Sequence, residues 1–511
     1  MKMFSYIGKK LEQLCTSCLY IITWFNLRGN RFSLELLYFL FISTLGFLIL
    51  HSLDVRTTTF TPRNLDLFFT SVSAATVSSM STVEMEVFSN TQLIILTILM
   101  FIGGEIFTSM VVHYIRTFFL HISPKDGNKV DYRDTQISFS DKIELKDLNI
   151  LEFGSSKPDH YSMEDLKHKS LKYLGGVVLF YFVFVQFLGV VSLLIYLNVI
   201  SSANSILNHK GLNPLTFSTF TIVSTFANCG FVPTNENMLV FQKNSGLLLI
   251  LIVQVLLGNT LYPPALRFSI WLVGKFVKKS ESRYLLNNSE GIEYGHLHGY
   301  LHSIFLLVTV VVFIMVQFIL FSSMEWSSAS LSGLNVYQKL VGILFQTVNS
   351  RHTGESIVDL STISGAILVL FVLMMYLPPY FSFLPVEEES GGQGSKRSRK
   401  MMENLIFSQP IYLVIFVILV CITERKHMVD DPLNFNVLNI VVEVVSAYGN
   451  VGFSTGYSCD RRLKQDGVCQ NKWYGFSGKW SDEGKLVLIV VMIFGRLKKF
   501  NMNGGKAWKV L

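Results

Sequence analysis

Long apolar runs alternate with shorter ones along most of the chain. Eight runs are long enough to cross a bilayer as helices, which takes about 20 residues: residues 35–53, 88–116, 171–199, 246–274, 301–321, 361–384, 404–423 and 486–500. Four shorter runs lie inside successive pairs of these spans, at residues 65–79, 214–230, 338–354 and 436–452. A membrane tolerates irregular backbone only where protein or water surrounds it. Each short run is therefore predicted to enter the membrane as a short helix and to return as an extended segment.

The order of helix, re-entrant segment and helix occurs four times, which indicates an internal repeat. It predicts an all-α membrane protein with eight transmembrane helices and four re-entrant pore loops, in a pseudo-four-fold arrangement around one pore. The expected order is a cytoplasmic N-terminal segment (1–34), four repeats (35–120, 170–280, 300–385 and 404–501), cytoplasmic linkers (121–169 and 281–299), a flexible basic linker (386–403) and a cytoplasmic C-terminus (502–511).

Composition and charge agree with this class. The chain of 511 residues is 50% hydrophobic and 15% charged, whereas soluble domains carry about 25% charged residues. Basic residues gather at the joints between repeats and near both termini, for example Lys10, Lys169, Lys278, Lys400 and Lys498. Because cytoplasmic loops are enriched in lysine and arginine, both termini and all joints are predicted to be cytoplasmic. The same placement beside membrane spans argues against nucleic-acid binding.

The four re-entrant runs end alike. Aligned with one another, they place Ser79, Gly230, Gly354 and Gly452 at one shared position. Glycine adopts left-handed backbone conformations that cost other L-residues about 1–2 kcal/mol, and rings of inward-facing backbone carbonyls bind dehydrated cations. A selectivity filter is therefore predicted, in which backbone carbonyls are the main ligands of Na⁺. Its residues are Ser78, Ser79, Asn228, Cys229, Gly230, Thr353, Gly354, Val451 and Gly452.

Two further features concern the alignment and its asymmetry. Ser73, Ser224 and Ser446 lie six residues before the shared position in three repeats, whereas the third repeat has Val348 there. Ser79 is the one shared position without glycine. We expect its side chain to narrow one quadrant of the ring or to add a ligand, and an unequal ring disfavours a row of dehydrated K⁺ ions.

Charged residues follow the predicted filter. Glu84, Glu236 and Asp359 come five or six residues after the shared position, where they would raise the cation concentration at an outer mouth. The alternative is that they are solvated surface carboxylates. Arg351 lies beside Gly354, and we expect it to turn away from the pore and to pair with a carboxylate.

The second helices of the repeats also align, at Gly104–Glu105, Gly258–Asn259, Pro378–Pro379 and Gly495–Arg496. Charged groups inside a membrane usually face the bundle interior or water. Glu105, Asn259 and Arg496 are therefore predicted to lie along the inner pathway, with Arg496 as a barrier to cations. The alternative is a pairing that only stabilises the helices. Pro378 and Pro379 are expected to break their helix and form a gate loop.

The cysteines and a search for catalytic motifs give no evidence of a catalytic site. Cys459 and Cys469 lie in a polar segment predicted to be extracellular, where either a disulfide bond or two free thiols would fit. The sequence contains no phosphate-binding loop, zinc-protease motif or nucleophile elbow. We therefore expect no enzymatic activity and no cofactor.

These motifs resemble those of the plant HKT transporters, within the wider Trk/Ktr/HKT cation transporter superfamily. The resemblance covers nearly the whole chain and rests on residues 78–86, 226–237, 349–355, 377–380 and 447–453. It implies four membrane–pore–membrane units around one pore, and a homodimer with one pore in each subunit. Members with serine at the position of Ser79 form the Na⁺-selective class. Asn228 is similar to the residue of Na⁺-type members, and Arg496 falls on the inner-pore arginine of the family.

The resemblance further implies a location in the plasma membrane and a role in withdrawing Na⁺ from xylem sap. Together with the residues above, it predicts passive, electrogenic, Na⁺-selective transport. A K⁺ transporter or a Na⁺/K⁺ symporter on the same fold is the alternative. A carrier built on inverted repeats is disfavoured, because the basic residues place all four repeats the same way up.

Overall fold

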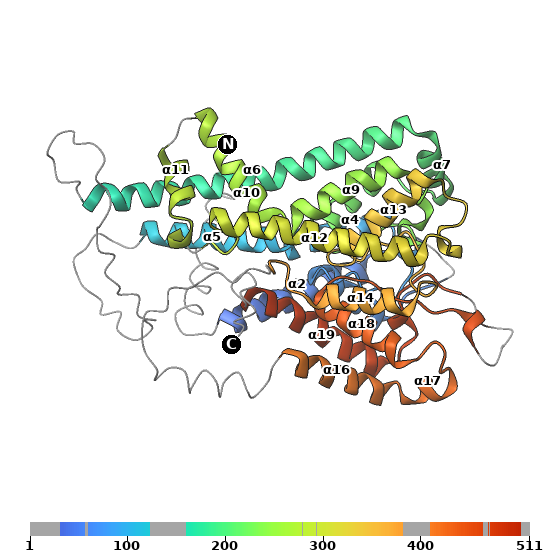
Figure 1. Ribbon diagram of the computed structural model, residues 1–511. Helices are drawn as coiled ribbons and strands as arrows, with labels where there is room; N and C mark the ends of the chain where they lie inside the picture. The colour runs from blue at the N-terminus through green and yellow to red at the C-terminus, as the bar shows by residue number, and fades with distance from the viewer. Residues whose placement is uncertain are drawn as a thin grey trace, which may run out of the picture.

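The computed structural model describes residues 31–56, 60–122, 160–277, 280–292, 294–381, 409–462, 469 and 471–501. Within these ranges the chain is helical, and its only strand-like pairing is an isolated bridge between Tyr457 and Lys472. Most of the helices run along one long axis (Figure 1). The linkers predicted at 121–169 and 386–403 lie mainly or wholly outside the described residues, as do 1–30 and 502–511.

In chain order, the helices are given in four successive groups. The first group is α2 (Arg31–Ser52), α3 (Asn64–Ala75), α4 (Asn90–Gly103) and α5 (Glu105–Ile122). The second is α6 (His160–Val199), α7 (Ser201–Lys210), α8 (Pro214–Phe226), α9 (Ser245–Gly258), α10 (Tyr262–Val277) and α11 (Ser280–Asn287). The third is α12 (Tyr300–Glu325), α13 (Val336–Asn349) and α14 (Gly365–Tyr376). The fourth is α16 (Gln409–Thr423), α17 (Arg425–Asp430), α18 (Val437–Gly449) and α19 (Asp482–Asn501).

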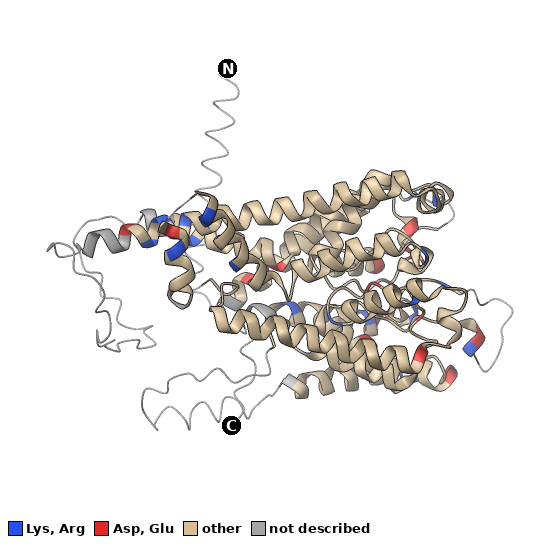
Figure 2. Ribbon diagram, turned by 45° about the horizontal axis from the view of Figure 1, so that its top comes forward, with Lys and Arg blue, Asp and Glu red and all other residues tan. Residues whose placement is uncertain are grey.

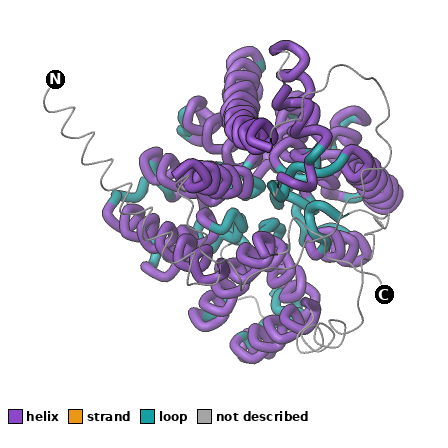
Figure 3. Tube along the Cα trace, turned by 90° about the vertical axis from the view of Figure 1, so that its left-hand side faces the viewer, coloured by secondary structure: helices purple, strands orange, loops and turns teal. Residues whose placement is uncertain are grey.

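Several helices have the length and hydropathy of membrane spans. Three are continuous, namely Ser33–Ser52, Asp165–Val199 and Tyr300–Glu325, and two further spans are bent pairs of helices. Charged residues gather towards the ends of the helices, whereas the middle of the body is largely uncharged (Figure 2). Viewed along the long axis, helices surround loop segments near the centre (Figure 3). This is the arrangement of a helical membrane protein with re-entrant segments.

Two of the predicted second spans are bent. Residues 88–116 form α4 and α5, which meet at an angle of 56°, and residues 246–274 form α9 and α10, which meet at 84°. The helices break because the backbone is extended at Gly104 (φ −60°, ψ 146°) and leaves the helical region at Asn259 (φ −136°, ψ −101°). In the third repeat α14 ends at Tyr376, just before Pro378 and Pro379, as the prolines predict.

Three glycines set the packing of these second helices against the short helices. A Cβ added to Gly103, Gly258 or Gly495 would overlap the carbonyl oxygen of Ala75, Phe226 or Tyr448, respectively. Each carbonyl belongs to the residue four places before the shared position. The register predicted from sequence is therefore wrong by one residue in the first repeat. Gly103, not Gly104, corresponds to Gly258 and Gly495, so that Gly104 and not Glu105 corresponds to Asn259 and Arg496.

The joint predicted at 281–299 packs into the helical body. Tyr294, His296 and Leu297 are buried among residues of α5, α6 and α10. The ring nitrogen Nδ1 of His296 lies 2.7 Å from the hydroxyl oxygen of Tyr380, which follows the proline pair. This joint therefore contacts the break in the third repeat.

Candidate functional site

Four short helices, α3, α8, α13 and α18, each end a few residues before a shared position. Three of them begin at an asparagine cap: the Asn213 side chain accepts hydrogen bonds from Leu215 and Thr216 ahead of α8, Asn335 forms a capping box with Gln338 at α13, and Asn436 accepts from Asn439 at α18. The C-terminal ends of the helices carry partial negative charge, which stabilises nearby cations. The local sequence thus directs four helix ends at the residues of the predicted filter.

The backbone is left-handed at all four shared positions. The φ angles are 53° at Ser79, 91° at Gly230, 64° at Gly354 and 100° at Gly452. Ser79 therefore adopts, at an energetic cost of about 1–2 kcal/mol, the conformation that glycine supplies in the other three repeats. Two residues earlier φ is also positive at Val77, Asn228 and Asn450. Alternating signs of φ turn successive carbonyls to the same side of a chain.

The four segments pack side by side. A Cβ added to Gly230 would overlap the carbonyl oxygen of Thr353, and one added to Gly354 would overlap that of Val451. One added to Gly452 would overlap the side chain of Ser79. The second segment therefore touches the third, the third touches the fourth, and the fourth touches the first.

The contact that remains joins the first and second segments. The Cys229 thiol lies against the backbone of Ser79 and is fully buried. The Asn450 side chain also donates to Ser78 Oγ at 2.8 Å, which links the fourth segment to the first a second time. The predicted filter residues are thus brought together in a closed ring.

The serines that recur before the shared position support this ring. The backbone N–H of Gly230 donates to Ser224 Oγ, and that of Gly452 donates to Ser446 Oγ, both at 3.0 Å. In the third repeat, where valine replaces serine, the N–H of Gly354 donates instead to the carbonyl of Asn349 at 3.3 Å. The buried Ser73 Oγ has no hydrogen-bond partner within the described part of the chain. The serine pattern thus has a structural role in two of three repeats.

Arg496 lies fully buried where α19 passes the break of the first repeat. Its guanidinium group donates to the carbonyl oxygen of Gly103 and lies 5.8 Å from the ring centroid of Phe39. Glu105, the partly buried first residue of α5, lies within electrostatic range of Arg496. Two residues predicted for the inner pathway are thus near each other.

Asn259 is buried at the break of the second repeat, and its Oδ1 has no hydrogen-bond partner among the described residues. The carbonyl oxygen before this break, on Gly258, accepts a hydrogen bond from the Asn228 side chain at 3.0 Å. A residue of the predicted filter therefore contacts the break directly.

The expectation that Arg351 pairs with a carboxylate is wrong. It is 9% exposed, and its Nη2 donates to the carbonyl oxygens of Pro378 at 2.5 Å and Pro379 at 3.3 Å. The guanidinium group also lies 5.0 Å from the ring centroid of Phe313. The Pro378 carbonyl also accepts from the backbone N–H of Phe381 at 3.3 Å, and Arg351 adds a side-chain donor where the helix has ended.

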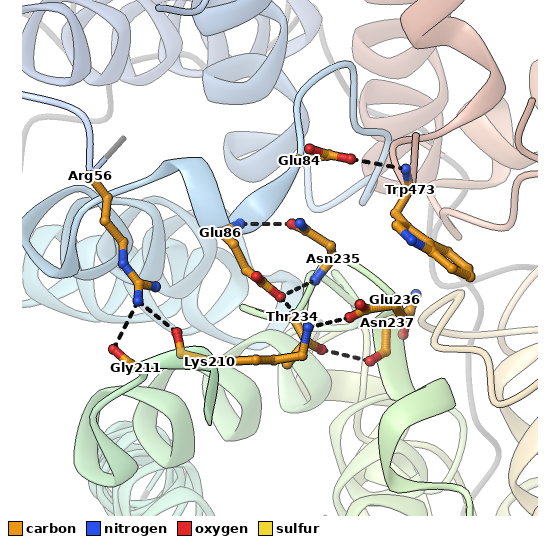
Figure 4. Close-up of polar contacts among 10 residues, drawn as sticks. All are labelled: Arg56, Glu84, Glu86, Lys210, Gly211, Thr234, Asn235, Glu236, Asn237 and Trp473. Carbon is orange, nitrogen blue, oxygen red and sulfur yellow. Dashed lines mark hydrogen bonds and ion pairs between the residues drawn. The ribbon is translucent and has the colours of Figure 1, made fainter. Parts of the chain in front are cut away.

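The three predicted outer carboxylates have separate partners. Glu84 accepts from the backbone N–H of Trp473 at 3.3 Å, and Glu236 pairs with Lys210 at 2.5 Å (Figure 4). Asp359 is exposed and accepts from the N–H of Ser361 in its own loop. They therefore do not converge on one point.

Sequence reasoning did not identify two further carboxylates near the segments. Glu86 lies 2.6 Å from the same lysine nitrogen that binds Glu236. Glu355, directly after Gly354, is fully buried and accepts from the hydroxyl of Thr225 at 2.5 Å. Two features of the sequence could have identified them. Glu86 lies two residues after Glu84, and Glu355 lies next to Gly354. Cys459 and Cys469 form a disulfide bond.

No group of three or more His, Cys, Asp or Glu side chains among the described residues could hold a metal ion. The chemistry of the closed ring is instead that of backbone carbonyls and a few hydroxyl groups. Together with the apolar helices, the ring defines the class of helical membrane proteins with re-entrant segments. Rings of backbone carbonyls are typical of cation pathways in such proteins.

Comparison with known proteins gives the family. A profile of the family described as cation transport protein, TrkH, matches residues 142–382 and 393–502. The chain is 51% identical over 463 residues to the sodium transporter HKT1 of Arabidopsis thaliana, covering 88% of this chain and 90% of that protein. It is 48% identical over 502 residues to the cation transporter HKT1;3 of Oryza sativa subsp. japonica, covering 95% and 92%. The chain belongs to the HKT family of cation transporters.

A solved structure shares the fold. The potassium transporter TrkH from Vibrio parahaemolyticus superposes with a TM-score of 0.51 at 15% sequence identity, covering 93% of this chain and 84% of that one. At this identity the likeness shows the helical fold alone, and the profile and the HKT relatives show the family. Its members move cations, use no cofactor and are not enzymes, and cations are the substrates here.

Proposed function

We propose that this transporter moves Na⁺ passively and electrogenically across the plasma membrane, through the ring formed by Ser79, Gly230, Gly354 and Gly452. The observation that carries the proposal is the left-handed backbone at all four positions in segments that touch one another. Such a ring offers carbonyl oxygens to a cation that has lost part of its hydration shell. The relative that is 51% identical carries the name sodium transporter, which favours Na⁺ as the ion.

Ser79 is the proposed source of Na⁺ selectivity. Its Cβ stands where the other three segments have only hydrogen, and it faces Gly452 across the contact between the first and fourth segments. A side chain at this place narrows one side of the ring and favours the smaller ion. A K⁺ transporter or a Na⁺/K⁺ symporter on the same fold remains the alternative, since relatives at 39% identity are named only as cation transporters.

The remaining predicted residues have roles in the same proposal. Below the ring, Arg496 would set a positive barrier that Glu105 partly offsets, and Asn259 would line the pathway. Arg351 would hold the gate formed by Pro378 and Pro379. At the other mouth, Glu84, Glu236 and Asp359 would attract cations.

The proposal also includes a homodimer with one pore in each subunit. Both termini would be cytoplasmic and the Cys459–Cys469 loop extracellular. The four repeats would span residues 35–120, 170–280, 300–385 and 404–501.

The proposal is tested by replacing Ser79 and measuring the reversal potential in mixed Na⁺ and K⁺ solutions under voltage clamp. Ser79→Gly should shift the reversal potential towards that of K⁺, because the ring becomes uniform. Ser79→Ala keeps the Cβ and removes the hydroxyl group, so it should stay Na⁺-selective if steric narrowing decides. Unchanged K⁺ permeability in Ser79→Gly would refute this role. Na⁺ current that requires external K⁺ would favour the symporter.

A further inference from the structure

A lysine lies between two carboxylates on the loops that leave the predicted filter. The Nζ atom of Lys210 is 2.6 Å from Glu86 Oε1 and 2.5 Å from Glu236 Oε2 (Figure 4). We refer to these three residues as the Lys210 cluster. Glu86 follows Ser79 by seven residues and Glu236 follows Gly230 by six. The cluster therefore joins the loops of the first and second repeats at one mouth of the ring.

The backbone of Lys210 is fixed. It is the last residue of α7, which ends at the left-handed Gly211 (φ 60°). The guanidinium group of Arg56 donates to the carbonyl oxygens of Lys210 at 2.6 Å and Gly211 at 3.1 Å. The ammonium group is thus delivered from a rigid helix end and is not the tip of a mobile loop.

The Glu86 carboxylate and the loop that carries Glu236 have contacts that do not involve the lysine. The N–H of Asn235 donates to Glu86 Oε1 at 3.0 Å, and the N–H of Glu86 donates to Asn235 Oδ1 at 2.9 Å. Thr234 closes the same loop with a hydrogen bond of 2.6 Å to the carbonyl of Asn237. Removing the lysine charge should therefore leave the Glu86 carboxylate and the backbone of Glu236 close to their present positions.

Two carboxylate oxygens converge on the position that the ammonium group occupies. Calcium binds carboxylate oxygens at about 2.3–2.6 Å, and the Nζ atom lies at 2.6 and 2.5 Å from two such oxygens. The side chains of Lys210, Glu86 and Glu236 are 17%, 24% and 25% exposed, so water could complete the coordination of an ion placed there. Burial lowers the pKa of Lys210, but hydrogen bonds to Glu236 and Glu86 raise it by more, so the ammonium group stays charged at neutral pH.

We propose that Lys210 is a tethered cation that fills an acidic cation site at the mouth of the transport pathway and thereby keeps divalent cations out of it. The inference rests on the proposed function, because that function places the cluster on the route of Na⁺. A tethered group acts at an effective concentration of about millimolar or more. An external calcium ion must therefore displace the Lys210 ammonium group before it can bind the two carboxylates. Lys210 is in this sense a specificity-determining residue.

The test is calcium block of inward Na⁺ current in cells that express the full chain. In Lys210→Gln the two carboxylates lose their cation, and the external Ca²⁺ concentration for half block should fall about tenfold or more. The double variant Lys210→Gln/Glu236→Gln removes one ligand and should return to the wild-type value. Lys243→Gln removes the charge of an exposed lysine elsewhere on the same repeat and should behave as wild type.

A second variant covers the case in which Lys210→Gln does not reach the membrane. Lys210→Cys, measured before and after reaction with aminoethyl methanethiosulfonate, should lose its calcium block when the reagent restores an ammonium group. Equal calcium sensitivity of wild type and Lys210→Gln, or a block in Lys210→Cys that the reagent does not change, would overturn the proposal. Absence of Na⁺ current in wild type would instead count against the proposed function, and the two failures are therefore distinct.

Discussion

The guanidinium group of Arg496, in the last helix, donates a hydrogen bond to the carbonyl oxygen of Gly103, 393 residues earlier in the chain. The carbonyl lacks a helical donor because the helix breaks at Gly104. The same solution recurs at Gly258, which Asn228 binds, and at Pro378, which Arg351 binds. Breaks in three second helices are thus stabilised by polar side chains near the predicted filter.

The glycine contacts predict different outcomes for two adjacent substitutions. Gly103→Ala should strongly reduce folded protein and current, because its Cβ would overlap the Ala75 carbonyl oxygen at the end of a pore helix. Overpacking of this kind costs about 1–3 kcal/mol or more. Gly104→Ala is the matched control, since its Cβ would meet its nearest atom at 3.4 Å and its φ is −60°. Surface expression and Na⁺ current are measured for both variants. If the protein tolerates both equally, the correspondence of Gly103 with Gly258 and Gly495 is contradicted.

The serine contacts predict a second difference. Ser224→Ala and Ser446→Ala should each lower stability by about 1 kcal/mol, because a buried backbone N–H of Gly230 or Gly452 loses its acceptor. Ser73→Ala should change stability little, since its Oγ has no partner among the described residues. Thermal unfolding of purified protein in detergent compares the three. A larger loss in Ser73→Ala than in the other two would refute the assigned roles.

The contacts of Arg351 predict the effect of its removal. Arg351→Gln should lower the unfolding temperature and the Na⁺ current, because two partly buried carbonyls at the proline break lose the hydrogen bonds that the guanidinium group donates. A lost hydrogen bond to a charged group costs about 1.5–3 kcal/mol. Arg425→Gln, on the exposed surface of α17, is the control and should change neither quantity. An increase of Na⁺ current in Arg351→Gln would show that the arginine opposes cations instead of holding the break.

The disulfide predicts which side of the membrane its loop faces. In whole cells, a reductant that does not cross membranes should expose Cys459 and Cys469 to an impermeant thiol reagent. The double variant Cys459→Ser/Cys469→Ser should show no such labelling. Labelling that requires permeabilised cells would place the loop in the cytoplasm and would reverse the predicted orientation.

Much of the fold was predictable because hydropathy is a local property. The apolar runs at 214–230 and 436–452 gave α8 and α18 within a few residues, and the asparagines ahead of both helices are ordinary N-caps. The breaks at Gly104 and Asn259 were not predicted, because both residues lie inside continuous apolar runs. The proline break was predicted, since proline cannot donate the helical hydrogen bond.

The site was predictable in part. The alignment of Ser79 with Gly230 identified positions that share a left-handed backbone, and glycine is the residue that such a backbone favours. The partners of charged residues were not predictable. Arg351 binds carbonyls and not a carboxylate, and Lys210 binds Glu86 across 124 residues of chain.

The sequence by itself determined the number and order of apolar segments, because hydropathy depends on neighbouring residues alone. Alignment of the four short runs also identified the shared positions, three of which have glycine. The tertiary structure decided where apolar helices break and which polar groups meet at the breaks. Those outcomes depend on hydrogen-bond partners that lie far away in the chain, such as Arg496 for Gly103. Inside a membrane, where water cannot satisfy a free carbonyl, such distant partners determine where a helix can break.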